Sequence, residues 1–179
     1  TNPCGAALAQ TPDAALEAAL DGDRMAAFGG IVALNSPVDE ASAALLTSKG
    51  SFFEVVVAPS FEPTALTMLC DRFAHIRLLA VGPLDVAEAP PRSASIEVRS
   101  LPGGALAQQA DVHRSDPDAW THHAGPEADG DDLKLAAFLD TVCRGLTSNA
   151  VALGPRTANG SLALAGGGAG PMDRGSPCP

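Results

Sequence analysis

The groups best placed for ligand binding in this sequence are a carboxylate and an amide beside predicted strands. Glu54 interrupts the apolar run of residues 53–59. A carboxylate in such a place must be ion-paired, reached by solvent or bound to a ligand. Asn149 directly precedes the apolar residues 150–153, and its amide can read a heterocycle or serve as a cap. Both residues are candidates for contact with a polar small molecule. The structural alternatives are an exposed strand end for Glu54 and a cap for Asn149.

Two glycine-containing segments can bring the backbone close to a ligand. Phe28, Gly29 and Gly30 join a predicted helix to a predicted strand, where α/β sheets build sites. The sequence alone favours a tight connection with Phe28 in the core. The glycine-rich run 166–170 follows a strand, and its N–H groups can bind an anion beside Arg174. Because this run lacks GxGxxG and a Walker lysine, a plain turn or linker is favoured.

The histidines, cysteines and serines form no recognised metal or nucleophile motif. No HExxH spacing, CxxC pair or GxSxG elbow occurs. The HxE and PCxxC ligand patterns of zinc deaminases are also missing. We therefore expect no catalytic metal, no disulfide framework and no catalytic triad. The four histidines are His75, His113, His122 and His123, and the four cysteines are Cys4, Cys70, Cys143 and Cys178.

Composition narrows the class of protein. The 179 residues are 46% hydrophobic and 18% charged, which suits one globular domain, and with 4% aromatic residues the core must consist mainly of Ala, Val and Leu. The net charge of -10 opposes binding to nucleic acid or anionic membranes, although arginines can still converge on a small anion. No apolar run reaches the roughly 20 residues that span a bilayer. We expect a soluble, cytoplasmic protein.

The first half of the chain predicts alternating strands and helices. Thr11 as N-cap and Pro12 at the first helical position begin a helix that ends near Asp21. The later elements follow from apolar periodicity and β-branched residues. This βαβ rhythm predicts a layered α/β domain with a parallel or mixed sheet. The expected strands are 31–34, 53–59 and 76–81, and the further helices are 38–46 and 62–74.

The second half is less regular. Residues 95–99 alternate like an exposed strand before a turn at 102–104, and the polar residues 111–132 predict a surface loop. Apolar residues then recur at helical spacing over 133–146. Two more strands are expected at 149–153 and 161–165.

Six stretches occur in an order that resembles one enzyme family. The chain is similar to the AICAR transformylase domain of the bifunctional purine biosynthesis family, which combines that activity with IMP cyclohydrolase. AICAR is 5-aminoimidazole-4-carboxamide ribonucleotide. The matching stretches are TNPCGAA, DRMAAFGGIVALNSPVD, FFEVVVAPSFEPTAL, VRSLPGGALAQQAD, LTSNAVAL and GGGAGPMDR.

The resemblance implies a fold and an activity. The fold is similar to cytidine deaminase, a three-layer α/β/α arrangement with a mixed sheet, and residues 1–179 are expected to be an incomplete, internal part of the transformylase domain. The implied enzyme transfers a formyl group from 10-formyltetrahydrofolate to the 5-amino group of AICAR without a catalytic metal. It works as a homodimer. The alternative is a noncatalytic nucleotide-binding or interaction module derived from this fold.

The resemblance also assigns site residues. Phe28 and Gly29 match positions beside the AICAR ring, and Glu54 matches an acidic ligand contact. Asn149 and Arg174 match polar contacts with AICAR. Met25 matches a residue near the folate.

The sequence departs from the family pattern in two ways. The family's Lys-His pair, with His as the proposed base and Lys at the oxyanion, precedes the segment matching residues 1–5 and is not in this sequence. No catalytic residue is therefore assigned, and we expect little or no independent activity. Pro171 also stands where the family usually has Gln, which makes the assignment of Arg174 less secure than that of Asn149.

Overall fold

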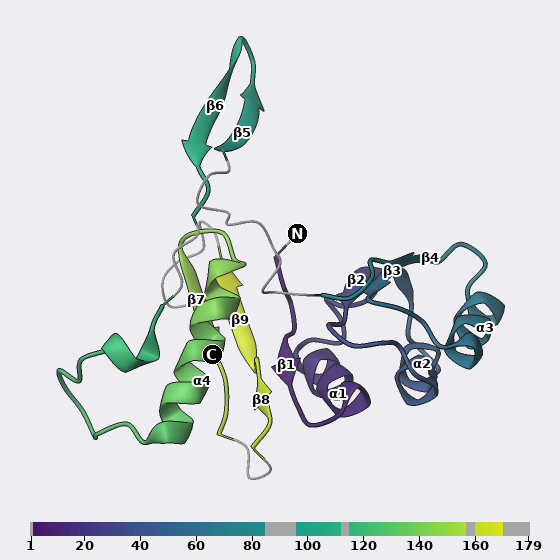
Figure 1. Cartoon of the computed structure of the whole chain (residues 1–179), viewed down its shortest axis with the longest axis horizontal. Coiled ribbons are helices and arrows are strands. Elements are labelled where there is room, and N and C mark those ends of the chain that lie inside the picture. Colours follow the sequence, from purple (N-terminus) through teal and green to yellow (C-terminus); the bar gives the residue numbers. More distant parts are fainter. Residues whose placement is uncertain (1, 85–95, 112–114, 157–159, 170–179) are drawn as a thin grey trace.

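The computed structural model describes residues 2–84, 96–111, 115–156 and 160–169. It is a mixed α/β structure, as predicted, with four small sheets (Figure 1). Within the described residues, no helix is long and apolar enough to cross a membrane. The elements are β1 (Ala7–Leu8), α1 (Pro12–Gly22), β2 (Gly30–Ala33), α2 (Glu40–Leu46), β3 (Phe53–Ala58), α3 (Pro63–Arg72), β4 (Arg77–Ala80), β5 (Ile96–Leu101), β6 (Gly104–Gln109), the 3-10 helix η2 (Pro117–Ala119), α4 (Gly130–Arg144), β7 (Ala150–Leu153), β8 (Leu162–Ala163) and β9 (Gly166–Ala169).

A parallel βαβαβ unit occupies the first half of the chain and confirms the predicted alternation. Strand β3 lies between β2 and β4, and both pairings are parallel. Helices α1, α2 and α3 lie together on one side of this sheet (Figure 1). The predicted helices and strands are all present here, with ends shifted by one or two residues.

The main hydrophobic core lies between this sheet and its helices. Val56 and Ala58 point to the same side of β3, and both are fully buried. Ala65 and Leu69, one helical turn apart on α3, meet them in the same cluster. The opposite side of the sheet is open, since Ile31 of β2 is exposed. The buried cluster comprises Leu16, Leu20, Val38, Ala43, Leu46, Phe53, Val56, Ala58, Ala65, Leu69 and Phe73.

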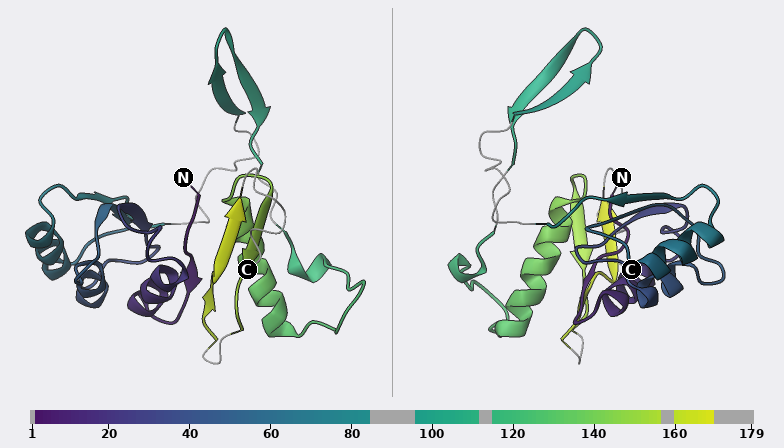
Figure 2. Two further views of the ribbon diagram at one scale, coloured as in Figure 1. Left: turned by 180° about the vertical axis from the view of Figure 1, so that it is seen from behind. Right: turned by 45° about the vertical axis from the view of Figure 1, so that its right-hand side comes forward.

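A second unit combines α4 with short antiparallel strands. Strand β7 pairs with β9, while β8 pairs with β1 near the start of the chain. The Ala165 N–H donates to the Leu153 carbonyl at 2.8 Å, and the Leu164 N–H donates to the Ala6 carbonyl at 2.8 Å. Helix α1 contacts both β1 and β8, which joins this unit to the parallel sheet (Figure 2).

The glycine-rich run forms a strand over its described part, so the expectation of a turn or linker was wrong there, and anion binding beside Arg174 stays a prediction. Residues 166–169 form β9, in register with β7 from Ala150↔Ala169 to Leu153↔Gly166. Glycine has a low strand propensity, but pairing with β7 satisfies the backbone groups of the run. Those N–H groups that enter the ladder are not available to bind an anion.

Strands β5 and β6 form a hairpin that stands away from the other sheets (Figures 1 and 2). The exposed strand and the turn were predicted, whereas the partner strand β6 was not. Gly103 has φ +85° at the turn, a conformation that favours glycine. Every residue of both strands is exposed.

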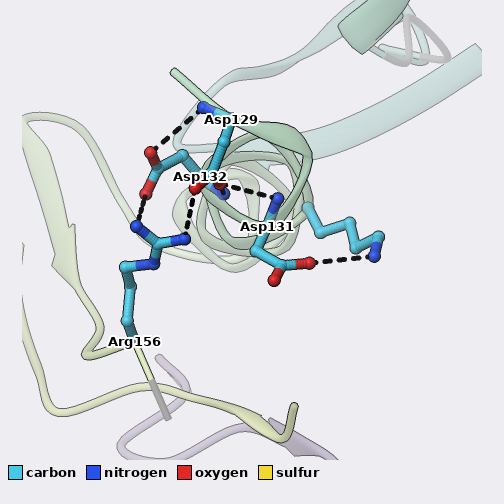
Figure 3. A network of polar contacts seen from close by, with 5 residues as sticks. Asp129, Asp131, Asp132 and Arg156 are labelled. Atoms are coloured by element: carbon cyan, nitrogen blue, oxygen red, sulfur yellow. Dashed lines mark hydrogen bonds and ion pairs between the residues drawn. The ribbon is translucent and has the colours of Figure 1, made fainter. Parts of the chain in front are cut away.

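Helix α4 begins earlier than predicted, so the end of the expected loop 111–132 was wrong. The Asp129 carboxylate accepts hydrogen bonds from the N–H groups of Asp131 and Asp132, each at 3.0 Å. The Asp132 carboxylate in turn accepts from the Asp129 N–H at 3.2 Å. This reciprocal capping box begins the helix at Gly130, three residues before the first apolar position (Figure 3).

Candidate functional site

The turn before β2 holds the predicted Phe28–Gly29 contact residues at the edge of the parallel sheet. The Gly29 N–H donates to the Phe52 carbonyl at 2.8 Å, and Gly29 has φ +73°. A Cβ on Gly30 would lie 2.9 Å from the Ala27 carbonyl oxygen. The two consecutive glycines therefore allow the chain to turn tightly into β2 beside the start of β3.

Phe28 lies on the surface, so the expectation of a core position was wrong. Its side chain is 64% exposed, and its ring lies 5.4 Å from that of Phe52 between centroids. Phe52 also contacts the buried Phe73 ring at 6.2 Å. Met25, the residue expected near a folate, is 89% exposed in the same turn region. The ring of Phe28 thus packs against Phe52 on one side, and its exposed part is available to a ligand.

Glu54 was predicted to be ion-paired, reached by solvent or bound to a ligand, and the structure shows the first two of these. Its carboxylate lies 3.7 Å from the Arg77 guanidinium of the neighbouring strand, and its side chain is 57% exposed. Gly30 pairs with Phe53, so Glu54 lies beside the turn that carries Phe28. Phe28 and Gly29 therefore lie just before β2, and Glu54 lies near the start of the neighbouring strand β3; within the described residues, no hydrogen bond, ion pair or ring contact joins Glu54 to Phe28. Ligands of open parallel sheets more commonly bind at the carboxyl ends.

Asn149 lies in the other unit, directly before β7. Its Oδ1 accepts a hydrogen bond from Ser148 Oγ at 3.2 Å, and its side chain is exposed. Among the described residues, no hydrogen bond, ion pair or ring contact joins Asn149 to Phe28 or Glu54. Arg174 lies outside the described residues. The predicted site residues thus lie in two parts of the fold, with Phe28, Gly29 and Glu54 near the starts of β2 and β3 and Asn149 directly before β7.

A pocket of about 170 Å³ adjoins the Phe28 ring; it is called the Phe28 pocket below. Its walls come from α1, from the turn after α1 and from the segment between α2 and β3. Sequence reasoning missed it, because Lys49 and its neighbours belong to no motif. The lining residues are Leu20, Arg24, Ala27, Phe28 and residues 48–53.

Sequence reasoning also missed a charged network at the start of α4 (Figure 3). Arg156 donates to Asp129 Oδ2 at 2.6 Å, and its Nη1 lies 3.5 Å from Asp132 Oδ1. The backbone hydrogen bond from Asp132, followed by the one from Arg156, lowers the pKa of Asp129. The bond to Asp129 raises the pKa of Arg156. This network ties the segment after β7 to the helix, which is a structural role.

No cluster of three or more His, Cys, Asp or Glu residues in the described part of the chain could hold a metal ion. His122 and His123, which are adjacent in the sequence, are both exposed. The groups that Phe28, Gly29 and Glu54 provide can support ring packing, hydrogen bonding and charge pairing.

These features define a mixed α/β protein with a candidate small-molecule site beside the amino-terminal ends of β2 and β3. The chain belongs to the AICARFT/IMPCHase bienzyme family, whose model matches residues 1–178. It is 42% identical over 151 residues to the bifunctional purine biosynthesis protein PurH of Parasynechococcus marenigrum (strain WH8102), covering 84% of this chain and 28% of the relative. It is 42% identical over 177 residues to PurH of Prochlorococcus marinus (strain MIT 9303), covering 97% of this chain and 31% of the relative. The chain thus spans less than a third of these relatives.

Proposed function

We propose that this chain forms part of the nucleotide-binding surface of an AICAR formyltransferase of purine biosynthesis. The observation that carries the proposal is the position of Phe28, Gly29 and Glu54 near the starts of the paired strands β2 and β3, inside two stretches that resemble the family. The formyl donor in this proposal is 10-formyltetrahydrofolate. The relatives' names, which specify a bifunctional purine biosynthesis protein, support the same pathway.

Each proposed contact residue has a group suited to AICAR. The exposed Phe28 ring offers a surface on which an imidazole can pack, since the ring is held by Phe52. The Glu54 carboxylate can accept hydrogen bonds from amino or carboxamide N–H groups. The Asn149 amide can pair with both the oxygen and the nitrogen of a carboxamide.

The reaction needs groups that this sequence does not contain. The 5-amino nitrogen of AICAR attacks the formyl carbon, the bond from that carbon to N10 of the folate breaks, and the proton lost by the amine is taken up at N10. The family's Lys-His pair would serve the proton transfer and the developing oxyanion. We propose that the chain binds the nucleotide, while these groups come from outside its 179 residues.

The wider setting follows from the same proposal. In this proposal residues 1–179 form an incomplete transformylase domain of cytidine deaminase-like, three-layer fold, and the parallel βαβαβ unit would supply its sheet and one helical layer. The complete protein would be a cytoplasmic homodimer. The competing proposal is a noncatalytic nucleotide-binding or interaction module derived from the same fold.

Calorimetric titration of the purified chain with AICAR, beside a formyl-transfer assay with 10-formyltetrahydrofolate, tests the proposal. We expect saturable binding of AICAR without turnover. Inosine, which lacks the free amine, the carboxamide and the phosphate, serves as the comparison ligand and should bind more weakly. Absence of AICAR binding by a chain that is folded by circular dichroism would favour the noncatalytic interaction module.

A further inference from the structure

The Phe28 pocket is positively charged in a chain that is strongly acidic. Its lining contains Arg24 and Lys49 and no carboxylate, while the whole chain carries a net charge of -10. Arg24 is paired with Asp21, so Lys49 supplies the positive charge without an ion-pair partner among the described residues; such a charge beside a concave surface attracts anions locally even when the net charge is negative. The pocket therefore differs in charge from the rest of the chain.

The turn between α2 and β3 holds Lys49 at the pocket. The Ser51 N–H donates to the Ser48 carbonyl at 3.1 Å, and the two hydroxyl groups lie 2.9 Å apart. Gly50 has φ +91°, as the third residue of a type II turn requires. This closed turn fixes the backbone of Lys49, which stands at its second position.

The polar groups of this turn are available to a ligand. Within the described part of the chain, Lys49 makes no ion pair, and the N–H groups of Lys49 and Gly50 donate no hydrogen bond. Arg24 is held by Asp21, with Nε 2.8 Å from Oδ1, and its guanidinium retains further donors. An ammonium group with unpaired neighbouring N–H groups is a suitable site for phosphate or carboxylate.

The size of the pocket limits what it can bind. Pockets for whole ligands commonly have volumes of about 300 Å³ or more, whereas the Phe28 pocket has about 170 Å³. It can therefore accept one group of a larger ligand. The Phe28 ring forms part of its wall, so the rest of that ligand would lie where the proposed function places a ring.

We propose that the Phe28 pocket binds an anionic group of a substrate, with Lys49 as the anchoring residue. This inference rests on the proposed function. The two substrates offer the same chemistry from two sources, namely the 5′-phosphate of AICAR and the glutamate carboxylates of the folate. Lys49 is a binding residue in this account and takes no part in the proton transfer.

Four ligands distinguish the two sources. Calorimetry in low salt would compare AICAR with its nucleoside, which lacks the phosphate, and pteroylglutamate with pteroate, which lacks the glutamate. Lys49→Ala should weaken one anion-bearing ligand roughly 10-fold, as loss of a charge-assisted contact predicts, and leave its truncated counterpart unchanged. A selective loss for AICAR assigns the phosphate, and a selective loss for pteroylglutamate assigns the carboxylates.

Lys134→Ala is the matched control, since Lys134 is the other lysine of the chain and lies on α4, paired with Asp131. It should leave all four affinities unchanged, and Lys49→Arg should retain most of the binding. Equal affinities of wild type and Lys49→Ala for both anionic ligands would overturn the inference while leaving AICAR binding intact. An equal loss in Lys134→Ala would also overturn it, because net charge would then explain the effect. If the folded wild-type chain binds neither AICAR nor pteroylglutamate, the proposed function fails as well.

Discussion

Asn149 is the residue whose proposed role can be tested with the least disturbance of the fold. Its side chain is exposed, and its one described hydrogen bond is to the adjacent Ser148. Asn149→Ala should weaken AICAR binding roughly 3- to 10-fold, the value of one net hydrogen bond or a little more. Calorimetry measures this change, and urea denaturation should show an unchanged midpoint.

Ser148→Ala is the control for that prediction, because it removes the neighbouring hydroxyl without removing the amide. Its AICAR affinity should match that of the wild-type chain. Unchanged affinity in Asn149→Ala would remove this residue from the proposed site, and a large shift in its urea midpoint would show a structural role instead.

At the residue scale, the sequence predicted which residues are candidates for the site better than it predicted the environment of each side chain. Glu54 was expected to be paired, solvated or ligand-bound, and the structure shows a partly exposed pair with Arg77. Phe28 was expected in the core because it is large and apolar, yet the tight turn through Gly29 places it outside. Exposure of a ring depends on the path of the backbone, which residue type alone does not specify. Lys49 escaped notice for the same reason.

At the scale of elements, the capping box of α4 makes a prediction about pH. The folded chain lowers the pKa of Asp129 below its ordinary value of 3.8, so the cap contributes stability above that pH. The contribution is lost as the pH falls below 3.8 and through the folded pKa, because the protonated carboxyl no longer accepts these bonds as strongly. Hydrogen exchange of residues 130–134 should therefore accelerate at acid pH.

Asp129→Asn is the matched variant, since its amide oxygen can still accept a hydrogen bond but does not titrate. After correction for intrinsic exchange rates, its first turn should lack this acid-dependent step. If wild type and Asp129→Asn show the same pH dependence between pH 2 and pH 5, roughly the window set by the ordinary carboxyl pKa, the cap does not control the helix start.

The elements of the first half could be predicted because their signals agree. Thr11 and Pro12 begin α1, and the β-branched residues of β3 suit the central strand of a parallel sheet. The signals of the second half conflict. The glycine content of residues 166–169 indicated a turn, whereas pairing with β7 makes this segment the strand β9. The acidic residues before Leu133 were interpreted as part of a loop, whereas they form the N-terminal cap of α4. Long-range pairing and reciprocal side-chain bonds decided both outcomes.

At the scale of the whole molecule, the site residues come from two units. Phe28 and Glu54 belong to the parallel sheet, whereas Asn149 begins β7 beside α4. The order of motifs along the chain predicted that they share a function, and the family match supports this. The sequence could not predict the arrangement of the units, because contacts between α1, β1 and β8 join segments more than a hundred residues apart.

Hydrogen–deuterium exchange with and without saturating AICAR tests most directly whether the two units bind one ligand. The account predicts slower exchange on AICAR binding in peptides that cover residues 26–30 and in peptides that cover residues 148–151. The β5–β6 hairpin should not change, and it serves as the internal reference. Slower exchange in only one of the two segments, or in neither, would contradict the claim that this chain presents a single AICAR-binding surface.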